Sequence, residues 1–328
     1  MLRRTLFGAQ EEEKATREGF SEGLVAAAEK DQRVVALAAD LADSVKMDAF
    51  RNKFRDRFFE VGITEQAMSG LASGMAAMGY IPFMASYAMF SPGRNWEQIR
   101  TTIAYNNVPV KVVGAHAGIS VGPDGATHQA IEDIAIMRMI PNMQVFVPCD
   151  GVEARVITEH IATTKSPTYL RLTREKTPII LPDNYTWNQG KGYMLHMSQH
   201  KNGGDFMHMV AIVGCGPILY EALKAAFALE KEGIGVMVVN FPQVKPLDVG
   251  YLLRIAKDVR AIVTVEEHQI AGGFGSAVTE YLSEHHPIRI ARIGIEDRFG
   301  QSGKVGELYE EYGLTSKHIA QKVRETLH

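Results

Sequence analysis

Short apolar runs that alternate with helical stretches constrain the fold of this chain more than any other feature. Residues 12–30 and 64–78 read as helices, and the second has a small residue at every second position from Gly70 to Ala76. Six strand-like runs surround them, at residues 34–39, 58–61, 81–85, 110–113, 145–147 and 168–172. Such alternation predicts a mostly parallel sheet covered by helices on both faces. Functional side chains are then expected in the loops at strand ends.

A turn-rich segment interrupts this pattern near the middle of the chain. Residues 176–192 contain Pro178, Pro182 and Gly190 and read as a linker. Beyond it, strands are expected at 210–213, 236–239, 261–265 and 288–293, and helices around 217–232, 272–285 and 304–326. The sequence therefore predicts two consecutive α/β domains with mostly parallel sheets, residues 1–180 and 193–328, joined by a linker over 181–192.

Composition narrows the possible ligands and locations. With 46% hydrophobic and 22% charged residues and a net charge of −3, the chain is typical of a globular protein without a broad basic surface. Nucleic acid and anionic membranes are therefore not expected partners, and an anionic ligand must be held by local arginines. The sequence has neither the apolar core of a signal peptide nor a run of about 18 to 20 apolar residues, so we expect a cytoplasmic protein. Cys149 and Cys215 follow or end apolar runs and are expected to be buried thiols.

The densest polar cluster is the loop at residues 116–129, His-Ala-Gly-Ile-Ser-Val-Gly-Pro-Asp-Gly-Ala-Thr-His-Gln, directly after a predicted strand. Its two imidazoles, His116 and His128, and its carboxylate, Asp124, suit proton transfer and hydroxyl recognition, while glycine lets the backbone approach a ligand closely. For either histidine alone, a satisfied structural role is an alternative. A metal site has no compact His or Cys spacing to support it, and we assign no metal ligand to this chain.

A carboxylate and an aromatic pair form the other candidate cluster. Glu65, in Val-Gly-Ile-Thr-Glu-Gln, stands where a strand ends and a helix begins, a position that dipole compensation or capping also explains. Tyr87 and Phe90 lie just past a strand, where core packing gives way to a loop.

Taken together and in this order, these segments resemble the pyrimidine-binding domain of the transketolase family. The resemblance extends over nearly the whole chain. Further segments resemble that family's substrate, cofactor and C-terminal-domain motifs: Lys-Ala-Thr-Arg17, Ala-Ala-Asp40-Leu41-Ala-Asp-Ser44, Leu-Thr-Arg174, and Glu266-Glu-His268 with Ala-Gly-Gly-Phe-Gly-Ser.

The resemblance implies thiamine diphosphate as cofactor. Glu65 would hydrogen-bond the aminopyrimidine ring and promote deprotonation of the thiazolium carbon, and a buried carboxyl suits a shared proton because desolvation disfavours its free charge. Tyr87 and Phe90 would stack on the ring, and Asp40 and Leu41 would belong to the cofactor site. The implied reaction moves a two-carbon ketol unit from a ketose phosphate to an aldose acceptor.

The resemblance also implies a substrate site for sugar phosphates. The loop residues His116, Asp124 and His128 would bind hydroxyls, and both histidines would help to move protons. Three further residues, Arg17, Ser44 and Arg174, would hold the distal phosphate, for which arginine is suited by its bidentate, charge-assisted hydrogen bonds. For Arg17 a solvated surface charge is the alternative.

Two positions depart from the commonest family pattern. Ser91-Pro-Gly93 stands where many members have a third aromatic residue, and Ala117-Gly118 replaces Asp-Ser, so stacking and substrate preference are open. A deoxyxylulose-phosphate synthase, which generally has Asp in place of His116, and the beta subunit of a 2-oxoacid dehydrogenase are related alternatives. A catalytically silent interaction subunit is an alternative from another class.

One family motif is missing from the sequence. The family holds the diphosphate and Mg²⁺ with a Gly-Asp-Gly run followed by Asn, and this chain contains no Gly-Asp-Gly. We therefore expect a separate N-terminal subunit to supply these ligands, an α2β2 heterotetramer, and an active site between subunits.

Overall fold

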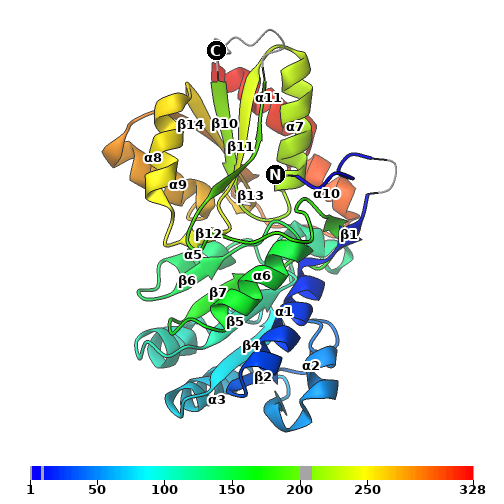
Figure 1. The fold of residues 1–328 in the computed structure, drawn as a ribbon, viewed down its shortest axis with the longest axis vertical. Coiled ribbons are helices and arrows are strands. Elements are labelled where there is room, and N and C mark those ends of the chain that lie inside the picture. Colours follow the sequence, from blue (N-terminus) through cyan, green and yellow to red (C-terminus); the bar gives the residue numbers. More distant parts are fainter. Residues whose placement is uncertain (1, 9–10, 200–208, 328) are drawn as a thin grey trace.

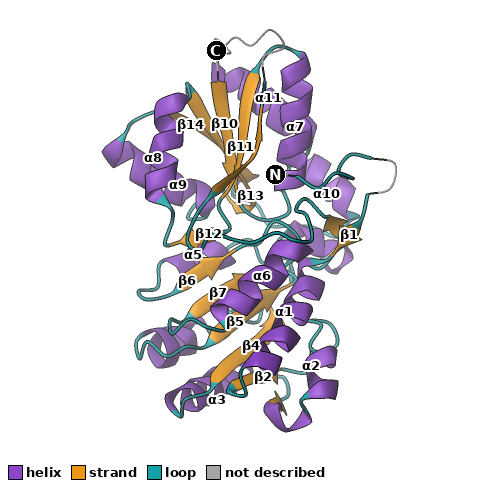
Figure 2. Cartoon of the chain, viewed as in Figure 1, coloured by secondary structure: helices purple, strands orange, loops and turns teal. Residues whose placement is uncertain are grey.

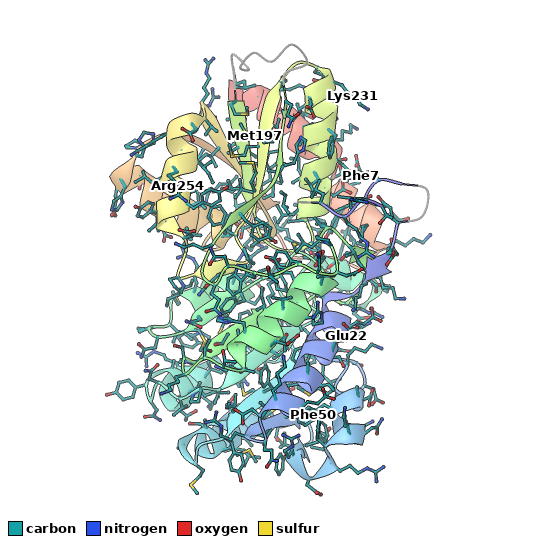
Figure 3. All side chains as sticks on the ribbon, viewed as in Figure 1. Phe7, Glu22, Phe50, Met197, Lys231 and Arg254 are labelled. Carbon is teal, nitrogen blue, oxygen red and sulfur yellow. The ribbon has the colours of Figure 1, made fainter. Side chains whose placement is uncertain are left out.

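The computed structural model describes residues 2–8, 11–199 and 209–327, which form two stacked α/β lobes, each built around one main sheet (Figures 1 and 2). Side chains fill the space between the sheets and their covering helices (Figure 3). The predicted fold class, two consecutive α/β domains with mostly parallel sheets, is confirmed.

The first lobe contains a seven-stranded sheet in the order β12-β6-β7-β5-β4-β2-β3. Its parallel strands are β2 (Val34–Ala38), β3 (Phe58–Glu60), β4 (Ile81–Tyr87), β5 (Lys111–Ala115), β6 (Gln144–Phe146) and β7 (Thr168–Arg171). The last strand, β12 (Gln243–Lys245), pairs antiparallel with β6 although it comes from the second half of the chain. The two halves therefore share a sheet edge.

Helices cover both faces of this sheet. On one face, α3 (Glu65–Ala77), the helical turns α4 (Trp96–Gln98) and η2 (Ile99–Ala104), and α5 (Asp133–Arg138) bury Met68, Ile103 and Met137 against the strands. On the other face lie α1 (Thr16–Lys30), α2 (Asp48–Lys53) and α6 (Gly151–Ile161), with Phe20, Phe50 and Ile157 in the core. Short helical turns complete the lobe at η1 (Arg55–Arg57) and η3 (Ile119–Asp124).

Glycine lets α1 and α6 approach closely. A Cβ atom on Gly19 would lie 1.9 Å from the carbonyl oxygen of Gly151, and one on Gly23 would lie 2.6 Å from that of Arg155. No side chain fits at either position without moving backbone. The close contact fixes the start of α1, where Arg17 lies.

The second lobe is a five-stranded sheet in the order β14-β13-β10-β11-β9. Its parallel strands are β10 (Met209–Gly214), β11 (Gly235–Asn240), β13 (Ala261–Gln269) and β14 (Arg289–Ile295), and β9 (Tyr193–Met197) is antiparallel at the edge. The helices of this lobe are α7 (Leu219–Lys231), α8 (Val249–Asp258), α9 (Phe274–His285), α10 (Val305–Glu311) and α11 (Ser316–Leu327).

Two helix predictions need correction. The helix expected over 12–30 begins at Thr16, because Glu13–Lys14 forms strand β1, which pairs with β8 (Thr177–Pro178). The helix expected over 304–326 is two helices, since the chain after α10 adopts the left-handed conformation at Gly313, with φ of 69°. Cys149 and Cys215 are both free and buried, as expected. None of the helices described is long and apolar enough to cross a membrane.

Buried polar contacts join the two lobes. Glu153 on α6 accepts hydrogen bonds from Asn240 on β11, at 3.0 Å, and from the Tyr193 hydroxyl on β9, at 2.7 Å. Arg171 and Asp133 form a second buried group, in which Arg171 Nη2 also donates to the carbonyl of Glu267, 2.8 Å away. Because buried charges are costly unless paired, these contacts favour one fixed arrangement of the lobes.

Candidate active site

The predicted site residues gather at one edge of the seven-stranded sheet. Asp40 follows β2, Glu65 follows β3, Tyr87 ends β4, His116 follows β5 and Arg174 follows β7. These strands are parallel neighbours, so their carboxyl ends lie side by side. This is the edge at which open α/β sheets bind ligands.

Glu65 lies buried at the start of α3, with 1% of its surface exposed. Its carboxylate accepts hydrogen bonds from side chains: Ser86 Oγ on β4 at 3.3 Å and Arg94 Nη1 at 2.6 Å. Asn95 Nδ2 donates to the backbone carbonyl of Glu65 at 3.1 Å and so ties the loop after β4 to the first turn of α3. The carboxylate is thus held toward the sheet edge and is bonded to neighbouring segments.

Arg94 was not among the residues predicted for the site. Its side chain is 45% exposed, and its guanidinium lies 4.8 Å from the ring centre of Phe90 while pairing with Glu65. Gly93 permits this turn, because a Cβ atom there would lie 2.1 Å from the carbonyl oxygen of Met89. Its position in the sequence could have indicated it, since Arg94 directly follows the Ser91-Pro-Gly93 segment that replaces an aromatic residue of the family pattern.

Four rings form one cluster at this edge. Tyr87 and Phe90 are stacked with centroids 5.8 Å apart, and Tyr87 also stacks on His116 at 3.9 Å. His128 meets Tyr87 and Phe90 edge-on, at 6.3 and 5.6 Å. The structure therefore brings together the aromatic pair and both loop histidines, which the sequence places in two separate segments.

His116 combines a strained backbone with a buried ring nitrogen that has no partner among the residues described. Its backbone has φ of 53°, a strained value for a residue with a side chain, and its buried Nδ1 atom has no hydrogen-bond partner in the described chain. Burial, and then the charges of Arg17 and Arg174, lower the pKa of His116 to about 3. The imidazole is therefore neutral near pH 7, and its Nδ1 atom is free to form a hydrogen bond with a ligand.

Two arginines lie beyond the rings. Arg17 donates from Nε to the carbonyl of Arg174, at 2.9 Å, and from Nη1 to the carbonyl of Ser44, at 2.6 Å. Hydrogen bonds between Thr16 and Thr173, including Thr173 N to Thr16 Oγ1 at 2.8 Å, bring the start of α1 to the end of β7. Burial and the charge of Arg174 lower the pKa of Arg17. Because the charges of the two guanidinium groups oppose each other, an anion bound beside both would be stabilised.

The remaining predicted residues lie along the same edge with different partners. Asp124 pairs with Arg174 at 3.2 Å, so the loop carboxylate is in direct contact with one of the two arginines. Asp40 has φ of 57°, and its backbone N–H donates to Glu60 Oε1 at 2.7 Å. Leu41 packs partly buried against the core beside α1 and α2. Within the described residues, no group of three or more His, Cys, Asp or Glu side chains is arranged to hold a metal ion.

Two models of known protein domains match most of this chain. A model of the transketolase pyrimidine-binding domain matches residues 12–179, and a model of the transketolase C-terminal domain matches residues 207–319. The chain belongs to the transketolase family. The family resemblance that the motifs indicated is confirmed, and the edge that carries Glu65 lies within the match to the pyrimidine-binding domain.

The relatives include transketolase sections that are separate chains. The chain is 41% identical over 317 residues to a putative transketolase C-terminal section of Methanocaldococcus jannaschii, covering 96% of each. It is 38% identical over 319 residues to the 6-deoxy-6-sulfo-D-fructose transketolase subunit SqwH of a Clostridium species, covering 97% of this chain and 96% of that one. The solved structure titled "Split gene transketolase, inactive beta4 tetramer" superposes with a TM-score of 0.84 at 39% identity, covering 95% of this chain and 98% of that chain. This chain is thus similar over nearly its whole length to the C-terminal subunit of a split transketolase.

Proposed function

We propose that this chain is the C-terminal subunit of a thiamine-diphosphate-dependent transketolase, which transfers a two-carbon ketol unit from a ketose phosphate to an aldose or aldose phosphate acceptor. The observation that carries the proposal is the buried carboxylate of Glu65, which lies beside Ser86 at the same sheet edge as the rings of Tyr87, Phe90 and His116.

The residues present fit the aminopyrimidine ring of thiamine diphosphate. Such a ring needs apolar aromatic faces and a carboxylate for one ring nitrogen, and both occur here within adjacent strand-end segments. His116, whose ring stacks on Tyr87, provides a further polar atom in this cluster through its unpartnered Nδ1. When bound, thiamine diphosphate supplies a nucleophilic carbon and an electron sink for C–C cleavage.

Glu65 has the role of hydrogen-bonding the ring nitrogen and holding a proton there. Arg94 Nη1 donates to Oε2 of this carboxylate, so a ring nitrogen that bonds to this oxygen would have to displace the Arg94 side chain. The exposed Arg94 side chain has room to move, whereas Glu65 is fixed by the helix start and by Asn95. We therefore propose that the Arg94 side chain moves away from Glu65 when the cofactor binds, while Glu65 stays in place.

His116 and His128 take the substrate side of the site. A neutral His116 can accept a hydrogen bond from a sugar hydroxyl, because its pKa of about 3 leaves the ring uncharged at neutral pH. To take up a proton as well, it needs a bound anion to offset the charges of Arg17 and Arg174 that lower this pKa. His128 Nδ1 lies 2.9 Å from Thr127 Oγ1, which orients the ring toward the aromatic pair. The arginine pair, Arg17 and Arg174, then suits the distal phosphate of the substrate, with Ser44 beside it.

A second subunit completes the site in this proposal. The edge is open in the single chain, where the side chains of Arg94, Asp124 and Arg174 are 45%, 33% and 31% exposed. We propose that an N-terminal transketolase subunit covers this edge, carries the ligands for Mg²⁺ and the diphosphate, and forms an α2β2 assembly. The similarity to chains named as a C-terminal section and a transketolase subunit supports such a partner.

The test is a Glu65→Ala substitution in the complex of this chain with its N-terminal partner. Ketol transfer is expected to be abolished while the assembly, measured by size-exclusion chromatography, stays intact. Glu325→Ala on α11 of the second lobe, where the Glu325 side chain is 53% exposed, is the matched control and should retain wild-type turnover. Wild-type activity in Glu65→Ala would remove Glu65 from the cofactor site.

A further inference from the structure

The loop that carries His116 and His128 is anchored by a carboxylate from the other lobe. Glu267 on β13 accepts a hydrogen bond from the backbone N–H of Ser120, with 2.6 Å between Ser120 N and Oε1. The loop backbone fits tightly here, because a Cβ atom on Gly118 would lie 2.3 Å from Glu267 Oε1. Gly118 also has φ of 86°, which favours glycine.

Glu267 is held in turn by its own lobe and by β7. Its second carboxylate oxygen accepts a hydrogen bond from the hydroxyl of Tyr309 on α10, at 3.1 Å, and its carbonyl accepts from Arg171 Nη2 at 2.8 Å. Glu267 is 3% exposed. A carboxylate buried this deeply costs free energy unless several donors satisfy it, so its orientation is set by these partners.

The end of the same loop has an independent anchor. The side-chain amide of Gln129 donates to the loop carbonyls of Ile119 and Gly122, at 3.1 and 3.3 Å, and to the carbonyl of Gln301, at 2.9 Å. Gly300 leaves space for it, because a Cβ atom there would lie 1.8 Å from Gln129 Oε1. Both anchors join the loop to the second lobe: Ser120 comes four residues after His116, and Gln129 directly follows His128.

We infer that Glu267 is a positioning residue: it fixes the backbone of the 116–129 loop so that His116 and His128 keep their places against Tyr87. The strained backbone of His116 requires such support from its surroundings. The second lobe, none of whose described residues contributes a ring to the cluster, thereby sets the geometry of the sheet edge that carries the site. The catalytic part of this inference rests on the proposed function, and the ordering of the loop does not.

The test compares Glu267→Ala with Glu266→Ala. Glu266 is the matched control because it is the neighbouring buried carboxylate on β13, but it accepts from Phe274 N and Gly275 N within its own lobe, at 2.6 and 2.8 Å. Amide hydrogen exchange of the full chain, followed by mass spectrometry, is expected to rise roughly tenfold in loop peptides of Glu267→Ala, since the buried acceptor of the Ser120 N–H is lost. In Glu266→Ala the rise is expected at residues 273–276 instead. Unchanged loop exchange in Glu267→Ala, or an equal rise in both variants, would overturn the inference.

A conservative variant and turnover separate positioning from general stability. Glu267→Gln keeps an acceptor for Ser120 N–H and is expected to restore most of the loop protection, while Tyr309→Phe, which removes one hydroxyl, should give a smaller increase than Glu267→Ala. If Glu267→Ala does not fold, the test rests on Glu267→Gln and Tyr309→Phe, whose loop exchange is then compared with that of the wild type. In the complex with the partner subunit, Glu267→Ala should lower kcat more than it raises KM for phosphorylated sugar, and Glu267→Gln should recover kcat. A disordered loop with unchanged kcat would refute the catalytic part, whereas a wild-type complex without turnover would refute the proposed function and leave the exchange result standing.

Discussion

Removing one partner of the buried ion pair of Arg171 and Asp133 should cost far more stability than removing one partner of an exposed pair. The two side chains are 2% and 1% exposed, and Arg171 Nε lies 2.8 Å from Asp133 Oδ2, which also accepts from the Tyr169 hydroxyl at 2.7 Å. Replacing Arg171 by Met removes the positive charge and leaves the Asp133 carboxylate buried and unpaired. Breaking one partner of a buried pair costs about 3–5 kcal/mol in the free energy of unfolding.

Arg324→Met is the matched control for this change. Arg324 forms two hydrogen bonds with Glu232, at 2.7 and 2.8 Å, but both side chains are more than 40% exposed, and the expected loss is at most about 1 kcal/mol. Urea unfolding of both variants, followed by far-UV circular dichroism and tryptophan fluorescence, measures the difference. Adding Asp133→Asn to Arg171→Met should recover part of the stability, because it removes the unpaired charge. Equal losses in the two arginine variants would refute the reasoning.

Further predictions concern the titration of the loop, the phosphate site and helix packing. The pKa of His116 is about 6.5 in the unfolded chain and about 3 in the folded chain, so between these pH values the unfolded chain binds a proton that the folded chain does not. Stability should therefore fall as the pH drops below about 6.5, by about 3 kcal/mol at pH 4.5. Thermal unfolding of His116→Gln should show a correspondingly weaker pH dependence than that of the wild type. Arg174→Ala is expected to raise KM for phosphorylated sugars roughly 10- to 100-fold with a smaller effect on kcat, and an unchanged KM would remove Arg174 from the phosphate site. In urea unfolding of the isolated chain, Gly19→Ala should destabilise by about 1–3 kcal/mol because its Cβ would overlap α6, whereas Gly70→Ala, which meets no atom within 4 Å, should stabilise α3 by up to about 1 kcal/mol; destabilisation by both would contradict the packing argument.

Local pattern was sufficient for the central strands and for the fold class. The runs at 34–39, 81–85 and 261–265 are continuous and apolar because both faces of the sheet are covered, and they correspond to β2, β4 and β13. The edge strands β9 and β12 were missed. Strand β12 has three residues and joins the sheet of the other lobe, so its pairing depends on tertiary structure and leaves no periodic signal.

In the candidate site, too, the sequence predicted one part and not the other. Motifs identified Glu65, Tyr87, His116 and Arg174 one by one, and the parallel order of the strands explains why they meet. The partners that hold them were not predictable, since the hydrogen bond between Ser120 and Glu267 joins residues 147 positions apart. Such a contact depends on how the two lobes are docked, and sequence periodicity does not encode that docking.

Calorimetric titration of thiamine diphosphate, in the presence of Mg²⁺, tests the central claim most directly. The tagged chain is purified from its native cells with whatever co-purifies, and the cofactor is titrated into the complex and into the chain alone. The account predicts a stoichiometric partner that contains a Gly-Asp-Gly motif, one bound cofactor per copy of this chain in the complex, and cofactor-dependent ketol transfer. A chain that has no partner and binds no cofactor would contradict the account and favour a catalytically silent subunit.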